Sequence, residues 1–249
     1  MGMKAIILCA GYAMRMHPIT MNFPKSLLSI DDKEIVSHLV EHLESSKKVD
    51  SVHIITNSKF HKYFKLWADA SNFLIPVSII DDNTTSNAER LGAVGDLNYA
   101  IKAGAIDDDI IVLAGDNLVS FDMKEFIEFF ENMKKPIIAV HDLKDKELIS
   151  KKKGCVVVGD NNKVVHFEEK PAKPRSTITA PPFYIYPKLV LPLIQKYLDE
   201  GNNPDAPGHF LEWLHKVVDV HAFHIAEQYD IGTVESNNKV NSMFDISLE

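Results

Sequence analysis

The chain has 249 residues, of which 45% are hydrophobic, and this is enough apolar material for the core of one α/β domain. Its 27 Lys and Arg residues are outnumbered by 35 Asp and Glu, and the formal charge of −8 argues against a protein that coats nucleic acid or an anionic membrane. The apolar stretches are too short for a membrane span, and Cys9 and Cys155 show no metal-ligand or redox spacing, so we expect a cytoplasmic protein.

Short apolar runs alternate with longer amphipathic segments through the first half of the chain, which is typical of repeated βαβ units and a mainly parallel sheet. The pattern predicts strands over residues 4–8, 51–56, 75–80, 109–114 and 136–140. Between them it predicts helices over residues 34–46, 59–70, 95–103 and 123–133. Buried parallel strands are expected to be nearly all apolar and bounded by polar residues or turns, as these are.

The second half of the chain has a different pattern. Residues 154–158 and 163–167 are predicted to form two strands joined by the polar turn of residues 160–162. After a Pro-rich stretch, the pattern predicts a strand over residues 183–186, helices near 188–200 and 209–217, and a closing strand and helix. We see no internal repeat and no linker, so we expect a single domain over residues 1–249.

The segment that follows the first predicted strand is the first candidate site. In open α/β sheets, ligands bind beyond the carboxyl ends of the strands, and small residues such as Gly11 let backbone N–H groups approach phosphate oxygens there. Arg15 and Lys25 add two cations to the same segment, as neutralisation of a triphosphate requires. The alternative is an ordinary strand-to-helix loop with solvated basic residues.

Two aspartates lie where predicted strands end. Asp116 follows the apolar run of residues 110–114, and Asp230 begins the sequence Asp-Ile-Gly-Thr at residues 230–233. Magnesium prefers hard oxygen ligands and usually takes one or two carboxylates beside phosphate oxygens and water. Both residues are therefore candidate magnesium ligands, with a helix N-cap or a turn as the alternative.

The order of these motifs resembles the sugar-phosphate nucleotidyltransferases, the family of glucose-1-phosphate thymidylyltransferase. That family's pattern runs Ala-Ala-Gly-x-Gly-Thr-Arg, then Pro-x-Thr, then Pro-Lys, and it also contains a Gly-Asp step and an Asp-Ile-Gly-Thr segment. The residues in register with the first three motifs are Gly11, Arg15, Pro18, Thr20, Pro24 and Lys25. The resemblance implies an α/β fold of the nucleotide-diphospho-sugar transferase type, a Rossmann-like three-layer sandwich with a mixed, mostly parallel central sheet. The nucleotide-binding part would be about residues 1–140 and the acceptor-binding part about residues 141–249.

The resemblance also implies a reaction and a role for each motif. The enzyme would transfer a nucleoside monophosphate from a nucleoside triphosphate, with dTTP or UTP favoured, to a sugar 1-phosphate, and would release pyrophosphate. Arg15, Lys25 and Asp116 would be catalytic, and Asp116 and Asp230 would bind Mg²⁺ as the cofactor. The residues expected to bind the nucleotide are Ala10, Gly11, Arg15, Lys25, Asn87 and Gly92.

The acceptor side is indicated by residues 167–171, Phe-Glu-Glu-Lys-Pro, which resemble the family's Glu-Lys-Pro segment. In the family the Glu binds sugar hydroxyls and the Lys binds the acceptor phosphate. The residues expected to bind the acceptor are Gly154, Glu169, Lys170 and Thr179. The expected partners are a nucleoside triphosphate and a small phosphorylated acceptor, with no nucleic acid and no membrane, while a homo-oligomer is left open.

Five positions depart from the family pattern. Ala13 stands where the family usually has Gly, and Met14 where it usually has Thr, which affects a backbone conformation and a hydroxyl contact. Asn87 replaces a Gln that reads the base in thymidylyltransferases, so the base is open. Pro181 and Pro182 stand where relatives have the start of a Gly-Ile-Tyr strand, so the acceptor need not be glucose 1-phosphate.

Two other functions are compatible with the sequence. A cytidylyltransferase acting on a phospho-alcohol such as phosphocholine would use an aromatic cage, for which Phe183, Tyr184 and Tyr186 are available. A non-catalytic nucleotide-sugar sensor would account for Ala13 and Met14. Residues 38–42, His-Leu-Val-Glu-His, also spell an inverted zinc-protease pattern, but we expect them to form the solvated face of a helix.

Overall fold

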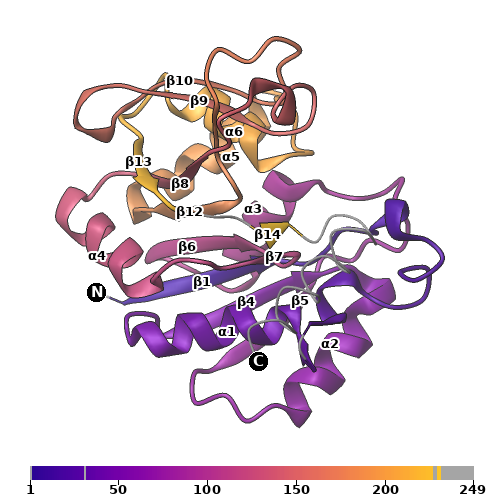
Figure 1. Ribbon diagram of the computed structural model, residues 1–249. Coiled ribbons are helices and arrows are strands. Elements are labelled where there is room, and N and C mark those ends of the chain that lie inside the picture. Colours follow the sequence, from indigo (N-terminus) through magenta and orange to yellow (C-terminus); the bar gives the residue numbers. More distant parts are fainter. Residues whose placement is uncertain (1, 31, 227–228, 231–249) are drawn as a thin grey trace, which may run out of the picture.

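The computed structural model describes residues 2–30, 32–226 and 229–230, and its chain path is shown in Figure 1. Strands β1, β4, β5, β6, β8, β9 and β13 run in one direction, and β10, β11 and β12 run in the other. The predicted mixed sheet with mostly parallel strands is therefore confirmed. In spatial order the main sheet contains β10 (Val164–Glu168), β9 (Cys155–Val158), β11 (Ile178–Thr179), β8 (Ile137–Asp142), β12 (Phe183–Tyr186), β6 (Asp109–Ala114), β1 (Met3–Leu8), β4 (Ser51–Thr56) and β5 (Val77–Asp81), and β13 (His221–His224) pairs with β8.

Two short pairs of strands lie outside the main sheet. β2 (Ser29–Ile30) pairs with β3 (Lys33–Glu34), and β7 (Asn117–Leu118) pairs with β14 (Tyr229–Asp230). The second pair joins the chain just after β6 to a segment more than 100 residues later, as Figure 1 shows. Short 3₁₀ turns lie at Met14–Met16, Lys25–Leu27, Lys146–Leu148, Asp160–Asn162 and Lys188–Val190.

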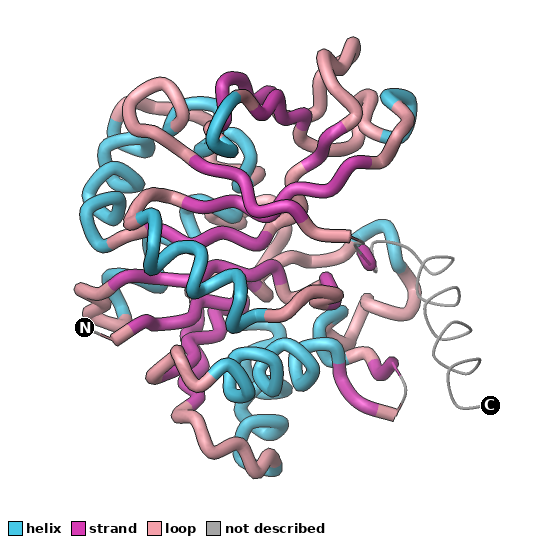
Figure 2. Tube along the Cα trace, turned by 60° about the vertical axis from the view of Figure 1, so that its left-hand side comes forward, coloured by secondary structure: helices cyan, strands magenta, loops and turns pink. Residues whose placement is uncertain are grey.

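Helices cover both faces of the main sheet and make it the middle of three layers (Figures 1 and 2). One face packs against α1 (Ile35–Ser46), α2 (Ser58–Ala70) and α4 (Met123–Met133). The other packs against α3 (Ala93–Ala103), α5 (Leu191–Asp199) and α6 (Pro207–Leu214). Successive strand residues point to opposite faces, so Ile7 belongs to the first core and Ile6 to the second. This confirms the three-layer prediction.

The helix starts have local causes. Asn57 caps α2 by accepting a hydrogen bond from the backbone N–H of Phe60, and Asp122 caps α4 by accepting from the N–H groups of Lys124 and Glu125. Pro207 lies in the first turn of α6. Backbone N–H groups in the first turn form no hydrogen bond within the helix, so the N–H that proline lacks is not needed there. The helix therefore begins at Pro207 and ends at Leu214, earlier than the predicted 209–217. The segment predicted as one helix near 188–200 is a 3₁₀ turn followed by α5.

The remaining predicted elements agree with the structure to within about two residues, including the hairpin of β9 and β10. The predicted closing helix lies outside the described residues. Among the residues that the structure describes, no helix is both long enough and apolar enough to cross a membrane.

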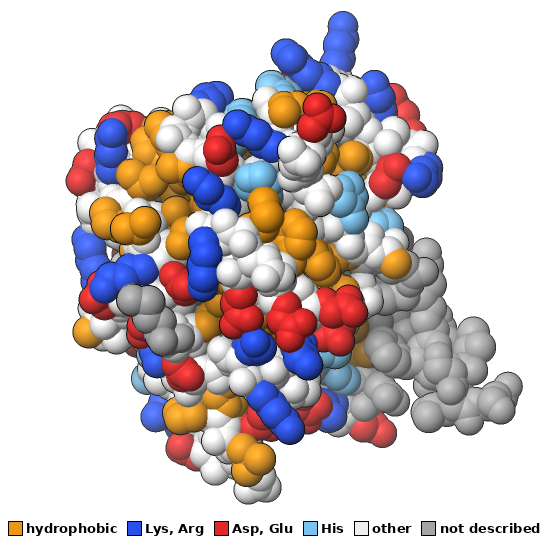
Figure 3. All heavy atoms as spheres, turned by 90° about the vertical axis from the view of Figure 1, so that its left-hand side faces the viewer, with side chains coloured by type: hydrophobic (Ala, Val, Ile, Leu, Met, Phe, Trp, Pro, Cys, Tyr) orange, Lys and Arg blue, Asp and Glu red, His pale blue; other side chains and the backbone are white. Residues whose placement is uncertain are grey.

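The surface on the side of α4 mixes charges of both signs. Figure 3 shows Lys and Arg side chains interspersed with Asp and Glu and with apolar patches on this face. Two of the ion pairs near α4 are Lys48 with Glu131, 2.8 Å apart, and Lys124 with Glu128, 3.8 Å apart. This face therefore offers no continuous cationic surface.

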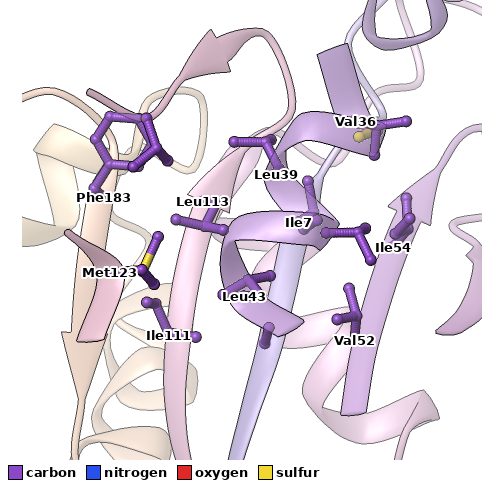
Figure 4. Close-up of a cluster of buried hydrophobic side chains, with 14 of the residues drawn as sticks. Ile7, Val36, Leu39, Leu43, Val52, Ile54, Ile111, Leu113, Met123 and Phe183 are labelled. Carbon is purple, nitrogen blue, oxygen red and sulfur yellow. The ribbon is translucent and has the colours of Figure 1, made fainter. Parts of the chain in front are cut away.

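The core under α1 is shown in Figure 4, where Leu39 and Leu43 point at Ile7 and Leu113 of the sheet. Replacing Leu39, which is 0% exposed, with Ala should lower the free energy of unfolding by about 3 kcal/mol, because a methyl-lined cavity replaces close contacts. Urea unfolding followed by circular dichroism measures this. The same substitution at Leu74, which is 90% exposed, is the control and should change stability by less than about 0.5 kcal/mol. Equal losses for both variants would contradict the assigned core.

Candidate active site

The candidate site lies at the carboxyl ends of β1, β4 and β6. The loop of residues 9–16 follows β1 and is held by the neighbouring strand ends through its backbone. The Cys9 N–H donates to the Ile55 carbonyl at 2.8 Å, and the Asn57 side-chain amide donates to the Ala10 carbonyl at 2.9 Å. The Gly115 N–H donates to the Leu8 carbonyl at 2.9 Å, which joins the end of β6 to the end of β1. The loop position is therefore fixed by the sheet.

A cavity of about 560 Å³ opens above this loop and is called the larger pocket below. Its walls come from the loop of residues 9–16, the segment before α3, the end of β6 and the start of α6. All of the residues predicted to bind the nucleotide line it, namely Ala10, Gly11, Arg15, Lys25, Asn87 and Gly92. Residues from six separate segments of the sequence are thus brought to one cavity.

Glycines around the larger pocket serve two different purposes. A Cβ atom on Gly115 would collide with the Cys9 sulfur, and a Cβ on Gly92, whose φ is +78°, would lie 2.5 Å from the Pro204 carbonyl oxygen. At these positions the fold itself requires glycine. A Cβ on Gly11 would meet no protein atom within 4 Å. Gly11 therefore leaves open space in the pocket, where a ligand can approach the backbone.

The central contact of the site is an ion pair between Lys25 and Asp116. The Lys25 ammonium lies 2.6 Å from Oδ2 of Asp116, and the Asn117 side-chain amide donates to Oδ1 of the same carboxylate at 2.7 Å. The Lys25 side chain is only 10% exposed, whereas that of Asp116 is 38% exposed. Charge-assisted hydrogen bonds of this length fix both groups firmly. Asp116 is thus held in place while it still faces the cavity.

A second cavity of about 230 Å³, the smaller pocket, adjoins the first. All four residues predicted to bind the acceptor line it, namely Gly154, Glu169, Lys170 and Thr179. Asp116, Pro182 and Pro207 line both pockets, so the two cavities meet at the Asp116 carboxylate.

Glu169 is the most enclosed charged group of the smaller pocket. Its side chain is 9% exposed, and the Lys170 ammonium lies 3.5 Å from its Oε1. Burial raises the pKa of Glu169, while the charges of Lys170 and His209 oppose the rise. A Cβ on Gly208 would collide with this carboxylate, so Gly208 makes room for it. The Thr179 hydroxyl donates to the Gly154 carbonyl at 2.8 Å, so its proton is used within the protein.

The two predicted magnesium ligands are brought close along the backbone. Strand β14 pairs with β7, and this places Asp230 opposite Asn117, the residue after Asp116. No group of three His, Cys, Asp or Glu side chains suited to a metal occurs in the described part of the chain. A magnesium ion bound mainly by phosphate and water needs only one or two carboxylates, so a partly exposed Asp116 with Asp230 nearby in the chain path fits that ion.

The departures from the family pattern can be placed as well. Ala13 has φ 46° and ψ 43°, the left-handed conformation that favours glycine, and its carbonyl accepts a hydrogen bond from the Thr20 hydroxyl at 2.8 Å. The backbone conformation expected of a glycine is therefore kept despite the Cβ. Met14 is exposed at the rim of the larger pocket and offers no hydroxyl.

The aromatic cage considered for a phosphocholine site is not assembled. Tyr184 lines the smaller pocket, but Phe183 points to the opposite face of the sheet, as strand alternation requires, and packs in the other core. Tyr186 is buried away from the pocket and packs against Phe210 at 5.7 Å between ring centroids.

The histidine motif in α1 has ordinary partners. Nε2 of His38 lies 3.1 Å from the Ile30 carbonyl oxygen, and Glu41 pairs with Lys33 at 2.7 Å. These contacts agree with the expected role as a partly exposed helix face.

Several pocket residues had no clear signal in the sequence. Arg90 and Asp205 both line the larger pocket and pair with each other at 3.0 Å, although they are 115 residues apart. Asp96 also lines it, in the first turn of α3. Lys152 and Lys153 line the smaller pocket. They belong to a run of three lysines directly before Gly154, and this run is the sequence feature that could have indicated a cationic wall.

Comparisons with known proteins agree with this geometry. Curated relatives include "Bifunctional protein GlmU" of Methanocaldococcus jannaschii, 29% identical over 199 residues, which are 78% of this chain and 42% of the relative. "UTP--glucose-1-phosphate uridylyltransferase" of Synechocystis sp. is 27% identical over 213 residues, 83% of this chain and 53% of the relative. "Glucose-1-phosphate thymidylyltransferase" of Mycolicibacterium smegmatis is 27% identical over 191 residues, 76% of this chain and 62% of the relative. The chain thus spans about half the length of the first two relatives.

Solved structures share the fold. A UDP-glucose pyrophosphorylase complexed with UDP-glucose has a TM-score of 0.84 at 19% identity, covering 99% of this chain and 100% of that one. A UTP-bound enzyme from Acinetobacter baumannii, described as UGPase, has a TM-score of 0.79 at 18% identity, covering 99% and 94%. The family model described as "Nucleotidyl transferase" matches residues 4–245. The chain therefore belongs to the nucleotidyl transferase family, as its motifs predicted.

Proposed function

We propose that this protein transfers a nucleoside monophosphate from a nucleoside triphosphate, with dTTP or UTP preferred, to a sugar 1-phosphate and releases pyrophosphate. The observation that carries the proposal is the meeting of two pockets at one carboxylate, Asp116, beside the Lys25 ammonium. The larger pocket has the size and glycine lining that a nucleotide needs, and the smaller one suits a phosphorylated sugar. The names of the relatives support this reaction class.

In the proposed reaction an oxygen of the acceptor phosphate attacks the α-phosphorus of the triphosphate. A new P–O bond forms, the bond between the α-phosphorus and the bridging oxygen breaks, and that oxygen leaves with pyrophosphate. The acceptor phosphate is already ionised, so no protein group has to remove a proton. The work of the protein is to position the two substrates and to neutralise charge at the phosphorus.

The pocket residues divide this work. Lys25 neutralises the α-phosphate and Arg15 holds the departing pyrophosphate. Asn87 and Gly92 contact the base, and the backbone at Ala10 and Gly11 faces the phosphates. In the smaller pocket Lys170 holds the acceptor phosphate, and Glu169 accepts hydrogen bonds from sugar hydroxyls. Gly154 and Thr179 shape the wall around the sugar. These roles are the ones that the family resemblance implies, and the location of each residue in one of the two pockets supports them.

Asp116 and Asp230 would hold Mg²⁺ in this scheme, and the ion would supply positive charge that neutralises the phosphates. The Asp116 carboxylate already accepts from Lys25 and Asn117, so its orientation is set before any ligand arrives.

A phosphocholine acceptor is less well supported. The smaller pocket presents Lys152, Lys153 and Lys170 at its walls, and these cations would repel a quaternary ammonium group. With only Tyr184 of the three aromatic residues in the wall, the cation–π contacts of a cage are also missing from this pocket's described lining.

The ion pair at the junction gives the first test of this function. Lys25→Met should lower kcat about 10²-fold or more, because it removes a positive charge from the phosphorus centre while keeping the volume of the side chain. Asp116→Ala should abolish turnover. Pyrophosphate release measures both, and circular dichroism shows whether the variants fold.

Lys33→Met is the matched control, because Lys33 forms an equally short pair with Glu41 on the exposed surface, away from both pockets. Exposed pairs of this kind contribute little, so its activity should stay within about twofold of wild type. Near wild-type activity of Asp116→Ala would contradict the metal assignment.

Backbone strain at the loop gives a second test. Ala13→Gly should raise the free energy of unfolding by about 0.5 to 1 kcal/mol. The substitution removes the steric strain of a Cβ in the left-handed conformation, and this gain is larger than the loss from the greater flexibility of glycine in the unfolded chain. Ala68→Gly, in the last turn of α2, is the control and should lower the free energy of unfolding by about 0.5 to 1 kcal/mol, because glycine loses more conformational freedom in a helix than alanine does. Chemical denaturation of both variants measures these changes. A lower free energy of unfolding for Ala13→Gly than for wild type would contradict backbone strain at this residue.

A substrate screen tests the function as a whole. Purified protein is incubated with Mg²⁺, each of the common nucleoside triphosphates, and either a hexose 1-phosphate or phosphocholine, and pyrophosphate is followed. We expect most release with dTTP or UTP and a hexose 1-phosphate. Preferential release with CTP and phosphocholine would favour the other acceptor class. Binding of a nucleotide sugar without any release would favour a sensor.

A further inference from the structure

Two buried carboxyl groups lie side by side behind the wall of the larger pocket. Asp96, in the first turn of α3, is 6% exposed and lines the pocket, and Asp82, just after β5, is 3% exposed. The segment after β5 contacts α3, because the Asn83 side-chain amide donates to the hydroxyl of Tyr99, one turn beyond Asp96. The two carboxyl groups are close enough to share a hydrogen bond once one of them is protonated. Two buried carboxylates within hydrogen-bonding distance of each other cannot both stay ionised, so the pair must share one proton.

The hydrogen bonds of the pair are unequal. Oδ1 of Asp82 accepts from the Thr84 N–H at 2.7 Å, and Oδ2 accepts from the Thr84 hydroxyl at 3.0 Å. Oδ1 of Asp96 has no hydrogen-bond partner among the described residues. Donors thus favour the ionised form of Asp82, while nothing compensates a charge on Asp96. The proton therefore belongs to Asp96, which donates it to Asp82.

The same network reaches the loop of residues 9–16. The Thr84 hydroxyl lies 3.2 Å from the Tyr12 hydroxyl, and Tyr12 lines the larger pocket. A continuous chain of hydrogen bonds therefore runs from α3 through Asp82 and Thr84 to the loop that carries Gly11 and Arg15. The two walls that enclose the nucleotide in the proposed function are joined by this chain.

We propose that Asp96 is a positioning residue of the larger pocket, which in its protonated form holds the first turn of α3 in register with the loop of residues 9–16. It acts through Asp82 and Thr84 and makes no contact with reacting atoms. This inference rests on the proposed nucleotide site. Loss of the proton would leave two buried negative charges in contact and push α3 away from the end of β5.

The physical environment agrees with a proton on Asp96. Burial, and then the charge of Asp82, raise the pKa of Asp96 to about 8. The ionisable groups that face the pair are Asp81 beside Asp82 and Tyr12, which itself also faces Glu89. None of these groups is a cation, so none of them would stabilise a second negative charge.

Nucleotide affinity as a function of pH tests the positioning role. The probe is UTP with excess Mg²⁺ and no acceptor, with binding measured by calorimetry at pH 7 and pH 9. A site that needs a proton on a group with a pKa of about 8 should lose about tenfold in affinity over this interval. Asp96→Asn keeps a hydrogen-bond donor toward Asp82 without a titrating proton, so its affinity should stay nearly constant.

Two further variants sharpen the test. Asp82→Asn should weaken binding at both pH values, because its NH2 group would replace one of the two oxygens that accept hydrogen bonds from Thr84. Asp69→Asn, on the exposed side of α2, is the control and should follow the wild-type pH profile. Equal pH profiles for wild type and Asp96→Asn would overturn the proposal. Failure of Asp96→Asn to fold would also overturn it, since the amide supplies the donor that the fold requires.

Stability of the free protein separates this inference from the proposed function. A carboxyl group whose pKa is raised by folding makes the native state less stable as the pH rises from about 4 to about 8, and not beyond. The urea midpoint of wild type should therefore fall relative to that of Asp96→Asn between about pH 4 and pH 8. Above about pH 8 the difference between the two midpoints should stay constant. If wild type binds no UTP but shows this divergence, the proposed function fails and the carboxyl pair stands. Parallel midpoints throughout would overturn the pair.

Discussion

The contact between the Lys25 ammonium and the Asp116 carboxylate, 2.6 Å apart, is the interaction on which the rest of the site depends. Lys25 comes from the segment after β1 and Asp116 from the end of β6, so the pair holds two neighbouring strand ends together through their side chains. It also lies where the two pockets meet. In a chain with a formal charge of −8, a polyanionic ligand needs such a local cation, and the carboxylate keeps that cation in place.

Space in the site is created by residues that lack side-chain bulk. Gly115 and Gly208 are required by packing against Cys9 and Glu169, whereas Gly11 borders open space. Gly115 and Gly208 allow strand ends and a charged side chain to pack closely, whereas Gly11 leaves the backbone accessible. Pro182 and Pro207, which line both pockets, contribute rigid walls without backbone N–H groups that would need a partner. Together these residues make two adjoining cavities at one end of the sheet.

The walls of the larger pocket contain two features that lower stability, a strained backbone and a buried polar atom without a partner among the described residues. Ala13 holds a left-handed conformation, and Asp96 buries an oxygen atom without a partner. Each feature costs stability, and both lie within the same cavity, whereas the cores on either side of the sheet are apolar and well packed. This distribution is typical of a protein whose binding surface is shaped by ligand requirements and whose framework carries the stability.

The sequence by itself determined the alternation of strands and helices, because apolar periodicity reports which faces are buried. Through its resemblance to a family motif it also predicted Gly11, Arg15, Lys25, Asp116, Glu169 and Lys170 as site residues, and the structure has all six lining the two pockets. The predicted start of α6 was two residues late, because a proline can occupy the first turn of a helix. The sequence also left open whether Phe183 could join Tyr184 in a cage, and the pleat of the strand places the two side chains on opposite faces. Only the tertiary structure brought Arg90 to Asp205 and Asp82 to Asp96. These pairs join residues whose local sequence carries no signal, since their proximity depends on how distant segments pack around the ends of the sheet.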